Sequence, residues 1–167
     1  GMVRAICVFC SSSDALAPEY FGAAAELGTL IGARGCELVY GGASVGLMGR
    51  LARAAKEAGA RVTGVIPRSF YARGLAFDGA DELILPLYDI GTLKVIRYPG
   101  PDSLPRIETL WDSPRLGPVK HVVAADVNSD GLTDLLAPQE ASNPETGDQV
   151  VVNVLLNDGK GSFSLVE

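Results

Sequence analysis

The stretch at residues 38–49, Leu-Val-Tyr-Gly-Gly-Ala-Ser-Val-Gly-Leu-Met-Gly, joins a short apolar run to an alanine-rich segment through a glycine-rich turn. The pattern predicts a strand over Glu37–Tyr40 and a helix over Leu47–Ala58. Glycine lets a backbone approach an anion closely, and the first turn of a helix offers unpaired N–H groups and a positive dipole end. The stretch therefore predicts a strand–turn–helix unit whose turn suits a phosphate group.

The same alternation continues on both sides of this stretch. Val3–Phe9 is a continuous apolar run, typical of a strand buried on both faces, and Pro18–Arg34 has helical spacing. Further strands are expected at Arg61–Ile66 and at Asp81–Leu85, the second of which we expect Pro86 to end. This order of strands and helices predicts an α/β fold with a parallel sheet and helices on its faces.

Two candidate phosphate loops follow the first two strands, at residues 11–13 and 41–46. Ligands of open α/β sheets bind at the carboxyl ends of the strands, where both loops would lie. Neither loop is a Walker A motif or a strict Gly-x-Gly-x-x-Gly motif. As glycine-rich loops alone, they are equally well explained as tight packing turns.

Three segments in fixed order carry a more specific resemblance: Cys-Ser-Ser at 10–12, the stretch at 38–49, and Val-x-Gly-Val-Ile-Pro at 62–67. Together they resemble the lonely-guy family, also called lysine-decarboxylase-like proteins, over about residues 2–86. The resemblance implies a Rossmann-like fold, a homodimer, and hydrolysis of the N-glycosidic bond of nucleoside 5′-monophosphates. It also implies a nucleotide or phosphate site, for which the predicted residues are Ser11, Ser12, Gly41, Gly42, Ser44, Gly46 and Met48.

The sequence departs from the family's pattern in the segment that carries the family's catalytic residues. After the fourth strand the family has an Arg-Lys pair and then Pro-Gly-Gly-x-Gly-Thr-x-x-Glu, and its Glu and Arg carry the reaction. Cleavage of an N-glycosidic bond develops positive charge on the sugar, which a carboxylate must stabilise. The nearest counterpart here, residues 91–95, has Val95 in place of the Glu, and the one histidine, His121, lies outside the matching region. We therefore assign no catalytic residue and expect the chain to be catalytically incomplete.

The composition changes near residue 88, where alanine-rich helices give way to short strands and turns. Strands are expected at residues 92–98, 106–111, 119–125, 150–156 and 163–166, with a polar stretch at 138–149. The chain is thus expected to divide into a Rossmann-like nucleotide-binding half, residues 1–88, and an antiparallel β segment, residues 89–167.

The β segment contains an acidic loop, Asp-Val-Asn-Ser-Asp-Gly-Leu-Thr-Asp at 126–134. Its alternating oxygen groups suit Ca²⁺, with predicted ligands Asp126, Asn128, Asp130, the Leu132 carbonyl and Asp134. An EF-hand would have Glu at the twelfth position, where Ala137 stands, and flanking helices. An Asx-rich turn without metal is the alternative.

This loop, its strand flanks and the sequence at 154–163 resemble an FG-GAP or VCBS repeat over about residues 91–165. The resemblance implies one four-stranded propeller blade with calcium in the loop. Repeat architectures generally need at least three units, and this segment has strands for two at most. The alternative to an enzyme is therefore a non-enzymatic calcium-binding module, or a chimera of two truncated parts.

The composition of the chain also limits its partners and its location. The net charge of −6, without a block of Lys or Arg, argues against nucleic acid as a partner, and no apolar run is long enough to span a membrane. Cys7 and Cys10 form a Cys-x-x-Cys at the end of an apolar strand, which favours buried thiols over a redox pair. With no signal peptide and three cysteines, we expect a cytoplasmic protein.

A parallel sheet ending at its fourth strand needs its edge covered, either by the β segment or by another copy of the chain.

Overall fold

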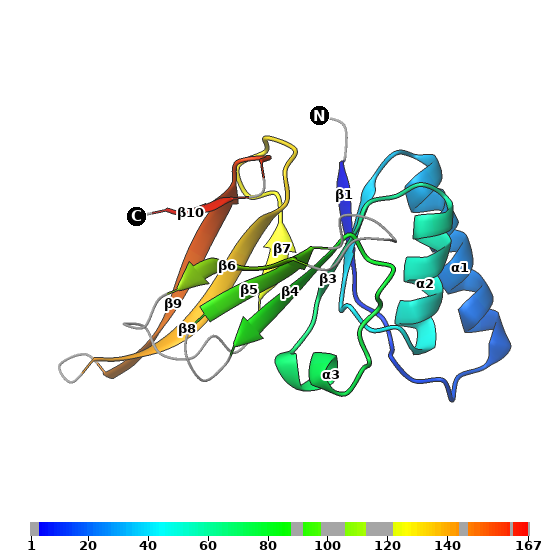
Figure 1. The fold of residues 1–167 in the computed structure, drawn as a ribbon, viewed down its shortest axis with the longest axis horizontal. Coiled ribbons are helices and arrows are strands. Elements are labelled where there is room, and N and C mark those ends of the chain that lie inside the picture. Colours follow the sequence, from blue (N-terminus) through cyan, green and yellow to red (C-terminus); the bar gives the residue numbers. More distant parts are fainter. Residues whose placement is uncertain are drawn as a thin grey trace.

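The computed structural model describes residues 4–87, 92–97, 106–112, 122–143, 147–160 and 162–166. The fold has three layers: helices, a six-stranded sheet and a four-stranded sheet (Figure 1). The elements are β1 (Ala5–Val8), α1 (Pro18–Ala33), β2 (Glu37–Tyr40), α2 (Gly46–Glu57), β3 (Val62–Val65), α3 (Arg68–Ala72), β4 (Glu82–Leu87), β5 (Thr92–Arg97), β6 (Arg106–Asp112), β7 (Val123–Ala125), β8 (Asp134–Asn143), β9 (Gly147–Asn157) and β10 (Phe163–Leu165).

Strands β1 to β4 are parallel and lie side by side in chain order. Right-handed crossovers between neighbouring parallel strands place their helices on one face, and α1 and α2 pack there against the sheet. The two helices approach closely at Gly28, where a Cβ atom would lie 2.4 Å from the Leu51 carbonyl oxygen. The mixed α/β architecture predicted for this half is therefore confirmed.

Strands β5 and β6 extend the same sheet past β4 in antiparallel orientation. The sequence predicted one antiparallel sheet for everything after residue 88, and this was wrong for these two strands. They cover the edge of β4 that a four-stranded sheet would expose. The first sheet thus contains strands from both sides of residue 88, and the division into domains there stays a prediction.

Pro86 does not end β4, contrary to expectation. The strand continues to Leu87, and Pro86 pairs with Leu93 of β5. The register with β3 reaches only to Ile84, so beyond that residue β4 has a strand neighbour on one side only. A proline, which lacks an N–H donor, is tolerated where one side of a strand is unpaired.

The second sheet is a four-stranded antiparallel meander in the order β10-β9-β8-β7. It includes much of the stretch at 138–149 that the sequence analysis left without strands. Here β8 pairs with β9 from Leu135↔Leu155 out to Asn143↔Gly147, so cross-strand pairing outweighs the polar local sequence. Membership of a propeller stays a prediction.

Two hydrophobic cores result from the two faces of the six-stranded sheet. Along β2, side chains alternate, so Leu38 faces the helices while Val39 faces the second sheet. On the second side, Val39, Ile84 and Val95 pack against buried residues of the small sheet, namely Ala124, Leu135, Ala137 and Leu155. The second half therefore covers the face of the sheet that has no helices.

Strand β1 is at the end of the six-stranded sheet, and the expectation that it is buried on both faces was wrong. Cys7 is exposed, Cys10 is half-buried, and the Phe9 side chain is 83% exposed, whereas Cys36 is buried. The prediction of buried strand thiols therefore fails at Cys7, because this face of β1 lies beyond the core between the two sheets.

Candidate functional site

A cavity of about 390 Å³ lies where β1, β2 and β3 end at their carboxyl ends. This is the edge at which open α/β sheets bind their ligands. The turn after β1, the glycine-rich turn after β2, and the segment from β3 through α3 all contribute to its wall. The lining residues are Ser12, Gly41, Ala43, Val45, Met48, Val65, Ile66, Pro67, Phe70 and Leu75.

The seven predicted nucleotide-site residues take different positions around this cavity. Ser12, Gly41 and Met48 line it. The Ser11 hydroxyl oxygen accepts a hydrogen bond from the Ser13 N–H (3.0 Å), and the Ser44 hydroxyl donates to the Leu75 carbonyl (3.1 Å). These two side chains therefore hold the loops in shape, and their part in binding stays a prediction.

Gly42 and Gly46, the remaining two, shape the turn through their backbones. Their φ angles are 76° and 64°, in the left-handed region that favours glycine. A Cβ atom on Gly46 would lie 2.4 Å from the carbonyl carbon of Ser12, and one on Gly42 would lie 2.8 Å from the Ile66 Cβ. The two phosphate-loop candidates are thus in direct contact, and only glycine fits between them.

The N-terminus of α2 already has an acidic partner that sequence analysis missed. Gly46 N–H donates to the Asp14 carboxylate at 2.9 Å, and Met48 N–H donates to the Ser11 carbonyl at 3.1 Å. A carboxylate at this position is favourable because it meets the positive end of the helix dipole. Asp14 follows the serine turn directly, so its position was the available signal. An incoming phosphate would meet this negative charge.

The wall opposite the serine turn is apolar. Met48, Ile66, Pro67 and Leu75 line it, together with Phe70, whose side chain is 43% exposed. Such a wall suits a flat apolar or aromatic group, since few polar side chains of the lining could satisfy a strongly polar one. The cavity therefore pairs one polar end with one apolar wall.

Two further side chains brace the glycine-rich turn from behind. The buried Tyr40 hydroxyl donates to the Ala43 carbonyl at 3.3 Å, and burial raises the pKa of Tyr40, so it stays a neutral donor. Arg53 donates to the Ser44 carbonyl at 3.0 Å and stacks over the Phe77 ring, 6.0 Å from its centroid. Both interactions fix the backbone of the turn.

No residue in the described lining of this cavity carries a carboxylate or an imidazole. Val95, which stands where the resemblance would place a Glu, is fully buried between the two sheets. Gly91 and His121 lie outside the described residues.

Comparison with known proteins shows which family and which relatives the first half of the chain is similar to. Residues 3–76 match the SLOG cluster4 family. Over 80 residues the chain is 45% identical to a probable cytokinin riboside 5′-monophosphate phosphoribohydrolase of Oryza sativa subsp. japonica, covering 48% of this chain and 32% of that protein. It is 41% identical over 80 residues to the cytokinin riboside 5′-monophosphate phosphoribohydrolase LOG3 of Arabidopsis thaliana, covering 48% of this chain and 37% of that protein.

The chain spans about a third of the length of the curated relatives it matches. Among solved structures, it is similar to the molybdenum cofactor carrier protein of Chlamydomonas reinhardtii, at 30% identity and a TM-score of 0.43. That likeness covers 50% of this chain and 49% of the carrier protein. The SLOG match ends before the strands that complete the first sheet, and it does not reach the acidic loop.

In the acidic loop, the three carboxylates predicted to bind calcium accept hydrogen bonds from N–H groups of the chain. Asp134 is fully buried, and its carboxylate accepts from the N–H groups of Val127 (3.0 Å) and Asn157 (2.8 Å). Asp126 accepts from Gly131 N–H at 2.9 Å, and Asp130 accepts from Leu132 N–H at 2.7 Å. Across the described residues, no group of three or more His, Cys, Asp or Glu side chains is placed to hold a metal ion. In this conformation the loop is an Asx-rich turn, and calcium binding stays a prediction.

Calcium binding by the loop can be measured through thermal stability. If the oxygens of Asp126, Asn128 and Asp130 rearrange around Ca²⁺, millimolar calcium should raise the melting temperature, because a ligand that binds only the folded state stabilises it. Asp130→Ala should abolish the rise, whereas Asp78→Ala, outside the loop, should keep it. Equal melting temperatures with calcium and with a chelator would contradict the prediction.

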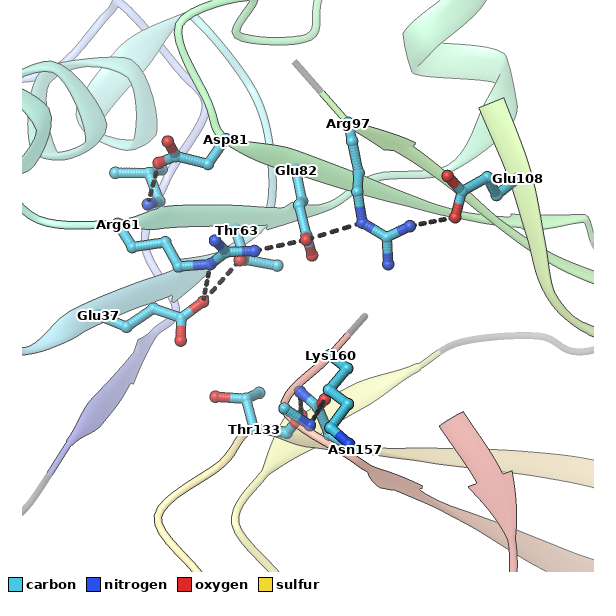
Figure 2. A network of polar contacts seen from close by, with 12 residues as sticks. Glu37, Arg61, Thr63, Asp81, Glu82, Arg97, Glu108, Thr133, Asn157 and Lys160 are labelled. Carbon is cyan, nitrogen blue, oxygen red and sulfur yellow. Dashed lines mark hydrogen bonds and ion pairs between the residues drawn. The ribbon is translucent and has the colours of Figure 1, made fainter. Parts of the chain in front are cut away.

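A second cavity, of about 270 Å³, lies between the two sheets at the amino ends of β2, β3 and β4. Figure 2 shows a row of charged side chains across the first sheet at this end, facing Thr133 and Asn157 of the second half. Glu82 accepts from Arg61 and, at 3.0 Å, from Arg97, which also pairs with Glu108. Arg61 and Arg97 each pair with carboxylates of this row, so this end of the inter-sheet core is closed by ion pairs rather than by apolar side chains. The row lies at the opposite end of the strands from the first cavity, which is lined by the turns after β1 and β2.

Glu37 is the residue of this row whose burial has a measurable consequence. Burial raises its pKa above the ordinary 4.5, although the Thr63 hydroxyl, 2.7 Å away, and Arg61 act in the opposite direction. The folded state therefore binds more protons than the unfolded state above pH 4.5, and stability falls as the pH rises through that window. Glu37→Gln, which removes the charge and keeps an acceptor for Thr63, should become more stable relative to the wild type as the pH rises above 4.5, as measured by urea titrations. Glu57→Gln, at an exposed position, is the control, and an equal gain there would contradict the assignment.

Proposed function

We propose that residues 4–87 bind a nucleoside 5′-monophosphate in the cavity at the carboxyl ends of β1, β2 and β3, and that the chain does not hydrolyse the N-glycosidic bond. The observation that carries the proposal is the cavity itself, which joins the serine turn and the start of α2 to an apolar wall at the carboxyl ends of three parallel strands. The relatives that match this half carry phosphoribohydrolase names, which points to the same ligand class.

The two ends of the cavity suit the two ends of such a ligand. A phosphate prefers hydroxyl and N–H donors near the positive end of a helix, and the exposed Ser12 lies beside the first turn of α2. A base prefers apolar contacts on its faces, and Met48, Pro67 and Phe70 offer them. The ligand is therefore expected to lie with its phosphate at the serine turn and its base at the apolar wall.

Hydrolysis needs a group that this cavity does not supply within the described lining. The sugar becomes cationic as the base departs, so a carboxylate beside it lowers the barrier. Neither the Arg nor the Pro-Gly-Gly-x-Gly-Thr-x-x-Glu motif that the lonely-guy resemblance implies is in the sequence. Binding without turnover is the function that these residues support.

The test combines calorimetric titration with AMP and an assay for free adenine. We expect AMP to bind and no adenine to form. Adenine release above the uncatalysed rate would overturn the second part of the proposal. Failure of AMP to bind, with the fold intact by circular dichroism, would overturn the first part. Adenosine, which lacks the phosphate, is the matched ligand control.

Asp14→Asn gives a sharper version of this test. The amide still accepts the Gly46 N–H, so the helix end stays satisfied, while the negative charge near the expected phosphate is removed. Removing like charge at a few ångströms should tighten AMP binding roughly threefold to tenfold at low salt. Glu19→Gln, an exposed charge in the first turn of α1, should leave affinity unchanged. Unchanged or weaker binding in Asp14→Asn would place the phosphate away from α2.

A further inference from the structure

A further cavity lies between the two sheets, on the side where β1 and β7 are found. Its volume is about 550 Å³, which is within the range of small-molecule sites. In the described part of the chain, β1 and β7 are the end strands of their sheets, and they contact each other across the gap. This cavity shares no lining residue with the one at the carboxyl ends of the strands, so a ligand here is independent of the proposed nucleotide site.

The floor of this cavity is apolar and is built from short side chains. Val39 of β2 and Ala124 of β7 are buried in the core between the sheets, and Ala5 and Cys7 of β1 also line the cavity. Such a floor suits an apolar group of the ligand, and the short side chains leave room for a large one.

Arg4 brings an unpaired positive charge to the wall of the cavity. Its carbonyl accepts from the Glu37 N–H at 2.7 Å, which fixes its backbone beside β2. Its side chain lies on the acidic loop, because a Cβ atom on Gly131 would be 2.6 Å from the Arg4 Cδ and 2.8 Å from its Nε. Among the described residues its guanidinium forms no ion pair, so its donors are available to an anionic group.

Two carboxylates of the acidic loop line the same cavity. Asp126 accepts from the Gly131 N–H at 2.9 Å through one of its oxygens, and Asp130 lies in the same wall. The Asp126 carboxylate and the Arg4 side chain therefore both lie against Gly131. The wall presents opposite charges that are close together and do not pair with each other.

Thr133 adds a polar group without a partner. Its hydroxyl oxygen is buried and has no hydrogen-bond partner within the part of the chain that the structure describes, and the residue lines this cavity. Buried hydroxyl groups are nearly always hydrogen-bonded, so an unpartnered one in a cavity wall indicates a group that the protein itself does not supply.

We propose that this cavity binds an α-amino acid with a large apolar side chain. Such a ligand carries its carboxylate and its ammonium on one carbon atom, which matches the neighbouring positions of Arg4 and Asp126. A ligand with only a carboxylate would meet two aspartates without an ammonium to pair with them, and an amine alone would leave Arg4 unpaired. The side chain of the amino acid would lie on the apolar floor.

Calorimetric titration of the full chain with L-phenylalanine, in the presence of a chelator, tests the proposal. The chelator keeps calcium from the carboxylates for which it would compete. We expect 2-phenylethylamine, which lacks the carboxylate, and 3-phenylpropanoate, which lacks the ammonium, to bind roughly tenfold more weakly than phenylalanine. Absence of phenylalanine binding up to about 10 mM, with the fold intact by circular dichroism, would overturn the proposal. Equal binding of either analogue would also overturn it.

Two charge-removing variants separate a binding role from a structural one. Arg4→Met keeps a long side chain against Gly131, and it should weaken phenylalanine roughly tenfold without weakening 2-phenylethylamine. Asp126→Asn keeps an acceptor for the Gly131 N–H, and it should weaken phenylalanine roughly tenfold without weakening 3-phenylpropanoate. Arg50→Met and Asp78→Asn, at exposed positions outside the cavity, are the controls. Equal loss of all three ligands in Arg4→Met or Asp126→Asn would contradict the assignment.

Cys7 and Thr133 report where the ligand lies. At about ten times its dissociation constant, phenylalanine should slow the alkylation of Cys7 by iodoacetamide about tenfold, as measured by mass spectrometry. Thr133→Val replaces the unpartnered hydroxyl with a methyl group, so it should raise the melting temperature of the free chain and weaken phenylalanine roughly fivefold. Undiminished alkylation of Cys7, or a Thr133→Val variant that binds phenylalanine as tightly as the wild type, would overturn this placement of the ligand.

Discussion

Replacing Leu155 with alanine should lower the free energy of unfolding of the whole chain by about 3 kcal/mol. Leu155 is fully buried in β9, opposite Leu135 in the register of the second sheet. Both leucines belong to the core that also contains Val39 and Ile84 of the first sheet. The cavity left by truncation would therefore loosen the contact that holds the two sheets together.

Urea denaturation distinguishes this result from a local effect. Trp111 is the one tryptophan and lies in β6 of the first sheet, so its fluorescence reports on that sheet, while far-ultraviolet circular dichroism reports on both. We expect both signals to shift together in Leu155→Ala, since the sheets share a core. Val150→Ala, exposed on the same strand, should change stability by less than about 0.5 kcal/mol. Two separate transitions, with only one shifted, would show that the two sheets unfold independently.

Gly46→Ala should cost about 3 kcal/mol of stability and lower AMP affinity at least about tenfold. Gly46 has φ of 64°, where alanine is strained, and its new Cβ would overlap the backbone of Ser12 at 2.4 Å. The new Cβ atom is fixed to the backbone, and the Ser12 atom that it would meet is itself a backbone atom, so neither can rotate away. The serine turn and the first turn of α2 would have to separate, and these are the groups expected to hold the phosphate.

Gly22→Ala is the matched control for this substitution. Gly22 lies inside α1, and a Cβ there would meet nothing within 4 Å. Alanine is favoured over glycine in a helix, so this variant should gain about 0.5–1 kcal/mol and bind AMP normally. Thermal melting and calorimetry on the same samples measure both quantities. If Gly46→Ala binds AMP as tightly as Gly22→Ala, the phosphate does not lie at this turn.

Much of the first half could be predicted because its signals are local. The strand at Glu37–Tyr40 and the helix after it follow from hydrophobic spacing and from the glycines at each end, and the structure places both within a residue or two. The same glycine-rich turn also indicated where a cavity would lie.

The features that were missed depend on contacts between distant residues. Phe9 was expected in a buried strand, but whether a strand is central or at an edge is decided by sheet order and not by its own sequence. Asp14 was overlooked because its partner, Gly46, is 32 residues away. Gln139 and its neighbours form a strand only because β9 pairs with them.

The chain-order sheet, β1-β2-β3-β4, has a consequence for how this protein can vary. With its helices on a single face, the sheet needs a cover for the other face, and that cover must bring apolar side chains to Val39, Ile84 and Val95 and polar ones to the charged row at the amino ends of the strands. Exchanging residues 122–166 for an unrelated meander should therefore yield a folded hybrid only where the new meander meets both parts of this face, and the cavity at the far end of the strands should then be kept.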